Sequence, residues 1–504
     1  MKDQNLILLE EKNPLMAFRL KQQMGLEIES IASEFQTTSS RELIFIKNLV
    51  SLINLSSDEL KEIEALQSIV IVVEEASKTT HDILEKDLSR WISSKSIHWY
   101  LEEQMTDELL IHLGWRFPFK KVRTTFQFPW FEKFKELSLS IDLIFSEYRD
   151  FGIKSFQNLY QNRWVYQKSS SLMTIKGSKS ALICGAGPSL KDSISWLKEI
   201  QNSCTLIAVG HAIEILDEYD IKIDVAAAVD PKYHLKKRLK NCPHFLFSTR
   251  VEPKMLLQDW KTFTLIPPSG ESLVEQEVWK RVFGQETIFD GGWNVATCVA
   301  AYIQKEKFER VILVGMDMCY SNQEKYPLKY DDEKEDLIEI IDRDGKVKTT
   351  IAPFLLGRNF LQELIKTSCF KWYSVGEGLC MESVSNLFSS NLYFEKENPS
   401  LIFDEIKDSR AADEFFDEFK NSCIHSELYL KKIVQIGRQE LYALEEVLLE
   451  EEIFYHLVLK RNWEVWGQYF SHHTQGQDPL LMKYVFFHDV SLKYKEVFLS
   501  TGDQ

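Results

Sequence analysis

The sequence predicts an α/β protein whose central domain is a Rossmann-like, mostly parallel sheet, with a smaller α/β domain before it and a helical domain after it. Three observations predict this class. Short runs that are apolar throughout fill the middle of the chain, which is typical of strands buried on both faces of a parallel sheet. Before this central region, β-branched runs alternate with helical segments, and after it the apolar residues follow helical spacing. The 504 residues exceed one ordinary core, so we expect parts at 1–171, 172–395 and 396–504.

The first part begins with a βαβαβ alternation. Glu42–Val50 and Ser68–Ala76 are β-branched runs, and Ser56–Leu66 between them predicts a helix opened by a serine cap. A helix over Thr80–Ile92 and a strand over Ser96–Glu103 complete the unit. The turn after its first strand lacks glycine, which close approach to a dinucleotide phosphate needs. We therefore expect no dinucleotide here.

Helices are expected on both sides of the central domain. From Trp115 to Gln167 the pattern becomes helical and strongly aromatic, which predicts a helical bridge that ends the first part. From 396 to the end there are few turn signals, and the apolar residues recur at helical spacing. The last part is therefore predicted to be a helical domain whose glutamate-rich stretch is a solvated helix face.

The central domain is predicted from eight strand-like runs separated mostly by short helical segments. These runs are ALICGAG, TLIAVG, DVAAAVD, HFLFST, FTLIPP, ETIFDGG, RVILVGMDM and KWYSVG. Because they are apolar throughout rather than alternating, they predict a largely parallel sheet covered on both faces. The charged stretch 330–346 after the seventh run is predicted to be a hairpin or surface insertion that acts as a lid over the cleft.

Composition narrows the class of protein. Hydrophobic residues make up 44% and charged residues 27%, the balance of a soluble globular protein. The net charge of −16 argues against a general nucleic-acid binder. A polar, acidic N-terminus and the lack of an apolar run of about 20 residues predict no signal peptide and no membrane span. The eight cysteines form no CxxC pair, so we expect reduced thiols rather than disulfides or zinc, in a cytoplasmic protein.

The stretch ALICGAGPSLKD predicts a strand, a sharp turn and the start of a helix. Gly185 and Gly187 allow backbone N–H groups to approach a ligand, Pro188 suits the first helical turn, and Ser189 can cap it. The stretch is neither GxGxxG nor a P-loop. It favours a ligand at the carboxyl end of this strand over a purely structural turn.

Polar or glycine residues also follow the other predicted strands. Since parallel strands end at one edge of a sheet, and ligands bind at that edge in open α/β sheets, these residues predict a cleft. The strand ends are Gly210-His211, Asp230-Pro231, Ser248–Arg250, Asp290–Gly292, Gly315–Asp317 and Gly376–Gly378.

The order of four motifs resembles a known family. GAGPSL, VDP, DGGWNVAT and VILVGMDMCYSNQEKY follow one another as in the motility-associated factor (Maf) glycosyltransferases. The order is also similar to the small bacterial lipooligosaccharide sialyltransferases, which have a GNGPSL turn and a G-x-D-x-x-Y block. The resemblance covers about 180–385, and the N-terminal α/β unit and helical C-terminal part suit the Maf proteins.

The resemblance implies a binding site for a CMP-sugar. Gly185, Gly187, Pro188 and Ser189 match the turn that holds the cytidine monophosphate, and Asp230 matches an asparagine that contacts the nucleotide. The other residues expected to bind the donor lie at further strand ends; they are Gly210, Gly291, Gly292 and Gly315.

The resemblance also implies catalytic residues. Tyr320 and Tyr326 have the spacing of two tyrosines that stabilise the departing phosphate, where phenolic donors need no metal; the alternative is ordinary loop packing. The histidine base of the sialyltransferases is missing from the matching segment KVKTTIAPFLLGRNF. Asp317, Glu377 and His211 are therefore the candidate general bases, and Asp317 alternatively fixes the loop.

The sequence thus predicts a metal-independent glycosyltransferase without a cofactor. It would move a nonulosonic (sialic-like) acid from a CMP donor to a hydroxyl acceptor, on serine or threonine of flagellin or another surface protein if it follows the Maf proteins. One alternative resembles the archaeal hydroxymethylpterin diphosphokinase, which uses ATP and Mg²⁺; Asp230, Asp290 and Asp317 would supply the carboxylates. The other alternative is a non-catalytic adaptor or chaperone of a secreted partner.

Overall fold

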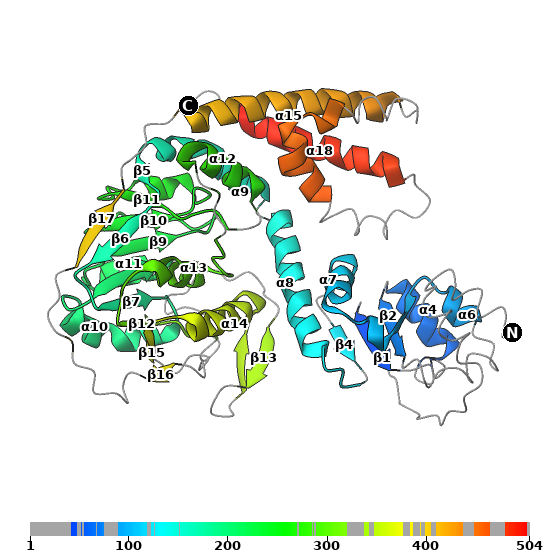
Figure 1. The fold of residues 1–504 in the computed structure, drawn as a ribbon, viewed down its shortest axis with the longest axis horizontal. Helices are drawn as coiled ribbons and strands as arrows, with labels where there is room; N and C mark the ends of the chain where they lie inside the picture. Colours follow the sequence, from blue (N-terminus) through cyan, green and yellow to red (C-terminus); the bar gives the residue numbers. More distant parts are fainter. Residues whose placement is uncertain are drawn as a thin grey trace. The chain divides into compact units, whose positions relative to one another are not determined.

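The structure is a computed structural model, shown in Figure 1, and its chain divides into two compact units. The first unit comprises residues 1–145 and 465–475, and the second comprises 146–464 and 476–504. The C-terminal helices therefore belong to the same unit as the central sheet. The structure describes residues 42–47, 52, 55–66, 68–74, 89–117, 122–124, 126–150, 152–269, 272–284, 286, 289–319, 337–341, 347–375, 384–386, 394, 399–404, 410–436, 448–463 and 479–500.

The first unit is built on a four-stranded parallel sheet in the order β3-β2-β1-β4. The described elements follow the predicted alternation: β1 (Leu43–Lys47), α4 (Ser57–Ala65), β2 (Ile69–Glu74), α6 (Ser89–Ser93) and β3 (Ile97–Leu101). Residues 80–88 of the predicted helix Thr80–Ile92 lie outside the described residues. The strands are apolar throughout because alternate residues enter two different cores, with Ile44 on one face and Phe45 on the other. Ser56 caps α4 as predicted, in a capping box with Glu59.

One strand of this unit was not predicted. β4 (Val122–Thr124) lies in the segment expected to be a helical bridge and pairs in parallel with β1. A strand of three residues carries too little pattern to stand out among helical neighbours, and the edge of β1 supplies its backbone partners. Helix α8 (Phe131–Asp150) follows it within the predicted helical bridge, whereas α7 (Asp107–Arg116) precedes it and begins before the predicted bridge.

The second unit contains a nine-stranded sheet in the order β16-β15-β12-β7-β8-β9-β10-β11-β5, and every neighbouring pair is parallel. The predicted α/β class is therefore confirmed. The strands are β5 (Ser169–Ser170), β7 (Ser180–Cys184), β8 (Thr205–Val209), β9 (Val225–Ala228), β10 (His244–Phe247), β11 (Phe263–Leu265), β12 (Arg310–Val314), β15 (Lys371–Val375) and β16 (Ser385–Asn386).

One predicted strand of the central domain, in the run ETIFDGG, falls partly outside the described residues, which omit Thr287 and Ile288. The described Phe289 makes an isolated parallel bridge with Ser269. The strand beside β11 at this edge of the nine-stranded sheet is β5, which pairs with β11 through Phe263↔Ser169 and Thr264↔Ser170. Phe289 instead packs against the core on one face of the sheet.

Helices cover both faces of the large sheet, and two separate cores result. One core joins the sheet to α10 (Ile194–Ile200), α11 (Ala212–Glu218) and α12 (Leu273–Phe283). The other joins it to α13 (Val295–Tyr302) and α14 (Ala352–Thr367). Within β7, Leu182 enters the first core and Ile183 the second, which explains why the strand is apolar throughout.

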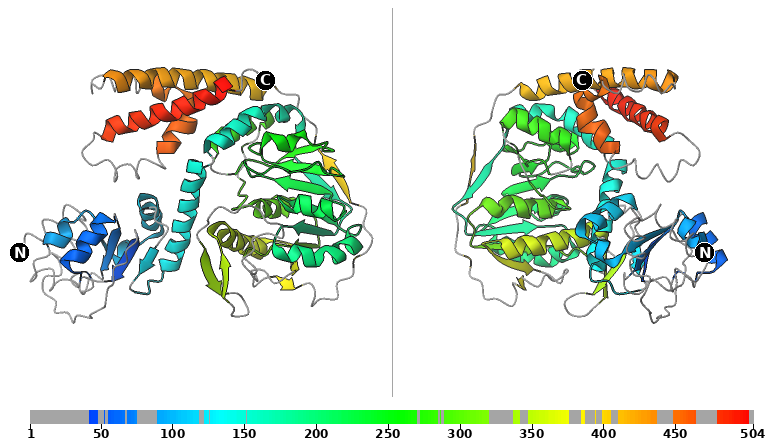
Figure 2. Two further views of the ribbon diagram at one scale, coloured as in Figure 1. Left: turned by 180° about the vertical axis from the view of Figure 1, so that it is seen from behind. Right: turned by 45° about the vertical axis from the view of Figure 1, so that its right-hand side comes forward.

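The C-terminal helices pack against helices that precede the sheet. α15 (Ala411–Ile436) and α18 (Pro479–Ser500) lie side by side in both views of Figure 2, and the turn Tyr455–Leu459 is a π-helix. They meet α9 (Gly152–Gln161) through aromatic side chains, and α15 meets η2 (Arg163–Gln167) through Asp413, which pairs with Arg163 and accepts a hydrogen bond from Gln167. The aromatic contacts include Phe156 with Phe419, Tyr494 and Phe498, and Tyr160 with Phe416 and Phe498.

Two further strand pairs lie outside the large sheet. β6 (Met173–Lys176) and β17 (Ser400–Phe403) pair antiparallel, so one strand corrects the purely helical prediction for residues after 396. β17 forms because Leu401 and Phe403 pack against the sheet core. β13 (Ile338–Ile341) and β14 (Val347–Thr350) form the hairpin predicted for the charged stretch after β12.

Two expectations from composition can be compared with the structure. Within the described parts of the chain, no helix combines the length and the apolar character that a membrane span requires. The seven cysteines that the structure describes form no disulfide with one another, and five of them are buried.

Candidate functional site

The candidate site lies where the strand order of the large sheet changes direction. From β7 the chain continues to β8, β9, β10 and β11 on one side, and then returns to β12 on the other side. β7 and β12 are therefore parallel neighbours that lead into opposite halves of the sheet. In open α/β sheets, ligands bind at the carboxyl ends of such a pair. The predicted residues of GAGPSL and GMD follow these two strands directly.

The turns after β7 and β12 are in direct backbone contact. Gly185 N–H donates to the carbonyl of Val314, and Gly187 N–H donates to the carbonyl of Gly315, both at 2.8 Å. Gly315 has a φ of +61°, and a Cβ there would lie 2.4 Å from the carbonyl oxygen of Gly185. The glycines are thus required by the close approach of the two turns. The N–H groups of Gly185 and Gly187 are therefore paired within the protein.

Asp317 joins the two turns through its side chain. One carboxylate oxygen accepts the Ser189 N–H at 2.8 Å, and the other accepts the Ser189 hydroxyl at 2.6 Å. Asp317 is only 6% exposed. Burial raises the pKa of its carboxyl, and the two hydrogen bonds from Ser189 lower it in part. Asp317 therefore caps the short helix η3 (Pro188–Ser193), which begins at Pro188.

A second glycine turn is locked between two helices. Gly292 has a φ of +65°, and its N–H donates to Asp290 Oδ1 at 2.9 Å. A Cβ on Gly292 would lie 2.7 Å from the ring of Phe360 in α14. Gly291 packs against Cys298, whose thiol pKa is raised to about 12 by burial. This turn therefore has no room for side chains on the α14 side.

Two of the other predicted strand ends, Gly210-His211 and Asp230-Pro231, make local turns, and Gly376–Gly378 lies outside the described residues. Gly210 has a φ of +53°, its N–H donates to the carbonyl of Ala227 at 2.9 Å, and its carbonyl accepts the Tyr233 hydroxyl at 3.0 Å. The His211 ring lies edge-on to the same tyrosine, with centroids 4.6 Å apart. Asp230 is exposed and accepts the Lys232 N–H at 2.8 Å.

The structure thus brings Gly185, Gly187, Pro188, Ser189, Gly315 and Asp317 into one contact cluster. A Cβ on Gly210 would lie 3.6 Å from Val295, the first residue of α13. Gly210 therefore lies next to the helix that follows the Gly291-Gly292 turn. The predicted catalytic residues Tyr320, Tyr326 and Glu377 lie outside the described residues.

Several residues that shape the site were not predicted. Asn294 caps α13, accepting the N–H groups of Ala296 and Thr297 at 3.0 Å each. Gly357 in α14 makes room for it, because a Cβ there would lie 2.5 Å from Asn294 Nδ2. The signals were present: an asparagine three residues before a threonine at a helix start, and a glycine within a helical pattern.

Asn158 of α9 and Asn162, the residue after its end, hold the loops at the carboxyl ends of β9 and β10. Asn158 Nδ2 donates to the carbonyls of Pro231 and Arg250 at 2.8 and 2.9 Å. Asn162, one helical turn later, donates to the carbonyls of Thr249 and Val251. Their i, i+4 spacing was visible in the sequence, but their partners lie 73 to 92 residues away.

The hairpin β13–β14 is attached at its base to the candidate site. The Thr350 hydroxyl donates to the carbonyl of Met318 at 2.6 Å, one residue after Asp317. Lys348, which belongs to β14 like Thr350, lies near enough to Asp317 to lower the pKa of its carboxyl slightly. The larger effect on this pKa is burial, which raises it. Among the described residues, no group of three or more His, Cys, Asp or Glu side chains could hold a metal ion.

Fold and site together define a Rossmann-like domain whose candidate ligand-binding edge lies at the β7–β12 switch point. Residues 154–323 match the family model described as 6-hydroxymethylpterin diphosphokinase MptE-like. The chain is also similar to the solved structure of the Maf glycosyltransferase from Magnetospirillum magneticum AMB-1, at 14% identity and a TM-score of 0.50, over 96% of this chain and 82% of that chain. No curated protein matches. The two matches confirm the predicted resemblance for the central domain and for the fold.

Proposed function

We propose that this chain is a metal-independent glycosyltransferase that moves a nonulosonic acid from a CMP-sugar to a hydroxyl acceptor. The observation that supports it most is the joined pair of turns at the β7–β12 switch point, held by Ser189 and Asp317. This is the edge at which open α/β sheets bind nucleotides. The fold that carries it resembles that of a Maf glycosyltransferase.

In this proposal the nucleotide lies over two glycine turns. Glycines make up much of both turns, Gly185–Ser189 and Gly291-Gly292, at the carboxyl edge of the sheet. Beside them, Gly210 follows β8 and Asp230 follows β9. Because both oxygens of Asp317 accept hydrogen bonds from Ser189, we assign Asp317 as a positioning residue that fixes the turn, in place of a general base.

The transfer step breaks the bond between the sugar and the phosphate oxygen of CMP and forms a bond from the sugar to the acceptor oxygen. Tyr320 and Tyr326, which follow Asp317 closely in the sequence, would donate hydrogen bonds to the departing phosphate. The acceptor proton passes to a base, for which His211 and Glu377 remain the candidates. The acceptor is a serine or threonine of flagellin or of another surface protein, and the β13–β14 hairpin closes over the cleft as a lid.

A second candidate function is supported by the description of the matching family model. A pterin diphosphokinase would need Mg²⁺ on the carboxylates of Asp230, Asp290 and Asp317. However, both oxygens of Asp317 are used by Ser189, and Asp230 and Asp290 each use one oxygen on the N–H of their own turn. These contacts favour the glycosyltransferase.

A ligand panel separates the two functions. We expect CMP in EDTA to raise the melting temperature of the full chain by a few °C, because saturation at about 100 times Kd adds about 2.7 kcal/mol to the stability of the folded state. Cytidine, which lacks the phosphate, serves as the matched control and should give a much smaller rise. ATP with Mg²⁺ should leave the melting temperature unchanged. A rise with ATP and Mg²⁺ alone would favour the diphosphokinase, and no rise with either nucleotide would favour the non-catalytic adaptor.

A further inference from the structure

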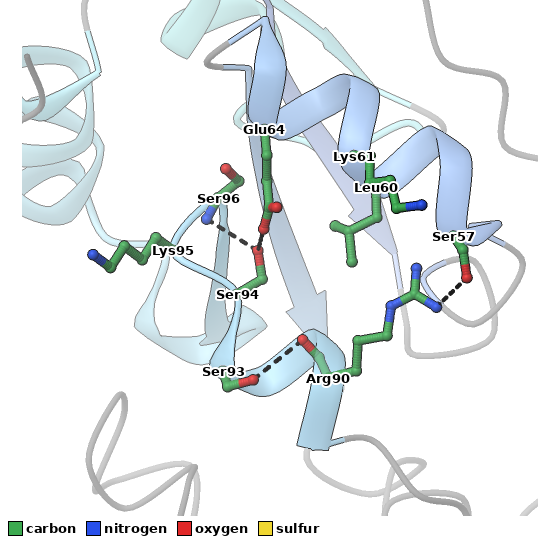
Figure 3. Close-up of a pocket in the computed structure, with 9 residues that line it drawn as sticks. All are labelled: Ser57, Leu60, Lys61, Glu64, Arg90, Ser93, Ser94, Lys95 and Ser96. Carbon is green, nitrogen blue, oxygen red and sulfur yellow. Dashed lines mark hydrogen bonds between the residues drawn. The ribbon is translucent and has the colours of Figure 1, made fainter.

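The first unit carries a polar groove between its helices α4 and α6, shown in Figure 3. Its volume is about 650 Å³, within the range of pockets that hold small molecules. One wall is a single face of α4, since its lining residues recur at helical spacing. The groove is lined by Ser57, Leu60, Lys61, Glu64, Arg90, Ser93, Ser94, Lys95 and Ser96.

Hydrogen bonds tie the two walls together at both ends of the groove. At one end the Arg90 guanidinium donates to the hydroxyl of Ser57, the first residue of α4. At the other end the Ser94 hydroxyl donates to Glu64 Oε1 at 2.8 Å, and the Ser96 N–H donates to the Ser94 oxygen at 3.2 Å. The separation of the helices is therefore fixed on both sides, so the groove is a preformed feature of the unit.

The two ends differ in charge. Figure 3 shows the Arg90 side chain reaching from α6 toward Ser57, on the side of the groove where Lys61 also lies, whereas Lys95 points away. Among the described residues, no carboxylate lies within ion-pair distance of Arg90, and Lys61 pairs only with exposed Asp58 at 3.6 Å. An exposed pair of that kind contributes little. Two cations thus converge at one end of a groove in a chain whose net charge is −16.

The opposite end offers hydroxyl groups and one carboxylate. Ser94 and Ser96 lie there with Glu64, and both serines are buried. The Ser93 hydroxyl instead donates to the carbonyls of Ser89 and Arg90 within α6. Serine hydroxyls both donate and accept hydrogen bonds, and a carboxylate accepts them, which suits the hydroxyl groups of a ligand. Guanidinium and ammonium groups suit a phosphate. The chemistry of the groove therefore changes from phosphate-binding to hydroxyl-binding along its length.

We propose that this groove binds the phosphate ester of a small polyhydroxylated compound such as a sugar phosphate. The phosphate lies between Arg90 and Lys61 at the start of α4, and the hydroxyl groups face Glu64, Ser94 and Ser96. The site lies in the first unit and is separate from the nucleotide site proposed at the large sheet, so either can exist without the other.

Calorimetric titration of the full chain with glucose 1-phosphate tests this site. We expect saturable binding, weaker binding of inorganic phosphate, and no binding of glucose up to about 10 mM, because the phosphate supplies the charge-assisted contacts. Arg90→Gln should weaken glucose 1-phosphate binding about tenfold or more. Lys61→Gln should act in the same direction, and its exposed pair with Asp58 contributes little to folding.

Lys135→Gln is the matched control, since it removes one positive charge from an exposed position of the same unit. It should leave the affinity unchanged within about twofold, whereas a general electrostatic effect would weaken all three variants alike. The site is contradicted if glucose 1-phosphate fails to bind, or if it binds Arg90→Gln and Lys61→Gln as tightly as the unaltered chain. Binding of inorganic phosphate and glucose 1-phosphate with equal affinity would remove the hydroxyl-binding end.

Discussion

Gly315→Ala is expected to lower the stability of the second unit by about 3 kcal/mol or more. Two effects add at this residue. Its φ of +61° is unfavourable for alanine, and the new Cβ would lie 2.4 Å from the carbonyl oxygen of Gly185 and 2.8 Å from Leu190 Cβ. Both neighbours belong to the turn after β7, which is itself bonded to β12. Urea denaturation followed by circular dichroism measures the loss as a lower midpoint.

Gly284→Ala isolates the first of these effects. Gly284 ends α12 with a φ of +69°, and nothing lies within 4 Å of the Cβ that alanine would add. We expect a loss of about 1–2 kcal/mol there, from backbone strain alone. Gly152→Ala, with neither a positive φ nor a close neighbour, should be nearly neutral. Equal losses for Gly315→Ala and Gly284→Ala would mean that the two turns at the switch point are not in contact.

The double variant Tyr320→Phe and Tyr326→Phe is expected to reduce turnover of a CMP-nonulosonic acid about 100-fold or more. Removing the phenolic oxygens removes the proposed donors to the departing phosphate, whose negative charge grows only as the bond to the sugar breaks. The affinity for CMP should change far less, because the nucleotide is proposed to rest on the glycine turns. Release of CMP in single-turnover experiments and a separate CMP titration measure the two quantities.

Tyr219→Phe provides the control for this pair. Tyr219 is 38% exposed at the end of α11, and its loss of a hydroxyl should leave both turnover and CMP affinity unchanged. Unaltered turnover in the double variant would exclude the two tyrosines from the transfer step. Parallel losses of turnover and CMP affinity would instead make them nucleotide-binding residues.

The sequence predicted the parts of the fold that rest on local pattern. The strands of the large sheet were visible because burial on both faces makes them apolar throughout, as in β7, whose five residues are all buried. The glycines and polar residues after those strands indicated which edge of the sheet is the candidate binding edge. The cap of α4 was visible because Ser56 and Glu59 have the spacing of a capping box.

The sequence could not predict contacts that depend on distant partners. Ser189 and Asp317 are 128 residues apart, and only the pairing of β7 with β12 brings them together. That pairing converts Asp317 from a candidate base into the residue that holds the turn. The same holds for the glycines, whose N–H groups were predicted to face a ligand but instead pair with the neighbouring strand end. Short strands such as β4 and β17 form because a partner edge or core is available.

The most direct test of the central claim is hydrogen exchange of the full chain with and without CMP, followed by mass spectrometry. We predict that CMP slows exchange in peptides covering 184–194, 290–297 and 315–319, which contain the joined turns and the second glycine turn, and leaves peptides of the first unit unchanged. Protection by CMP confined to the first unit, or to segments of the second unit away from the carboxyl ends of β7 and β12, would contradict the assignment of the nucleotide site.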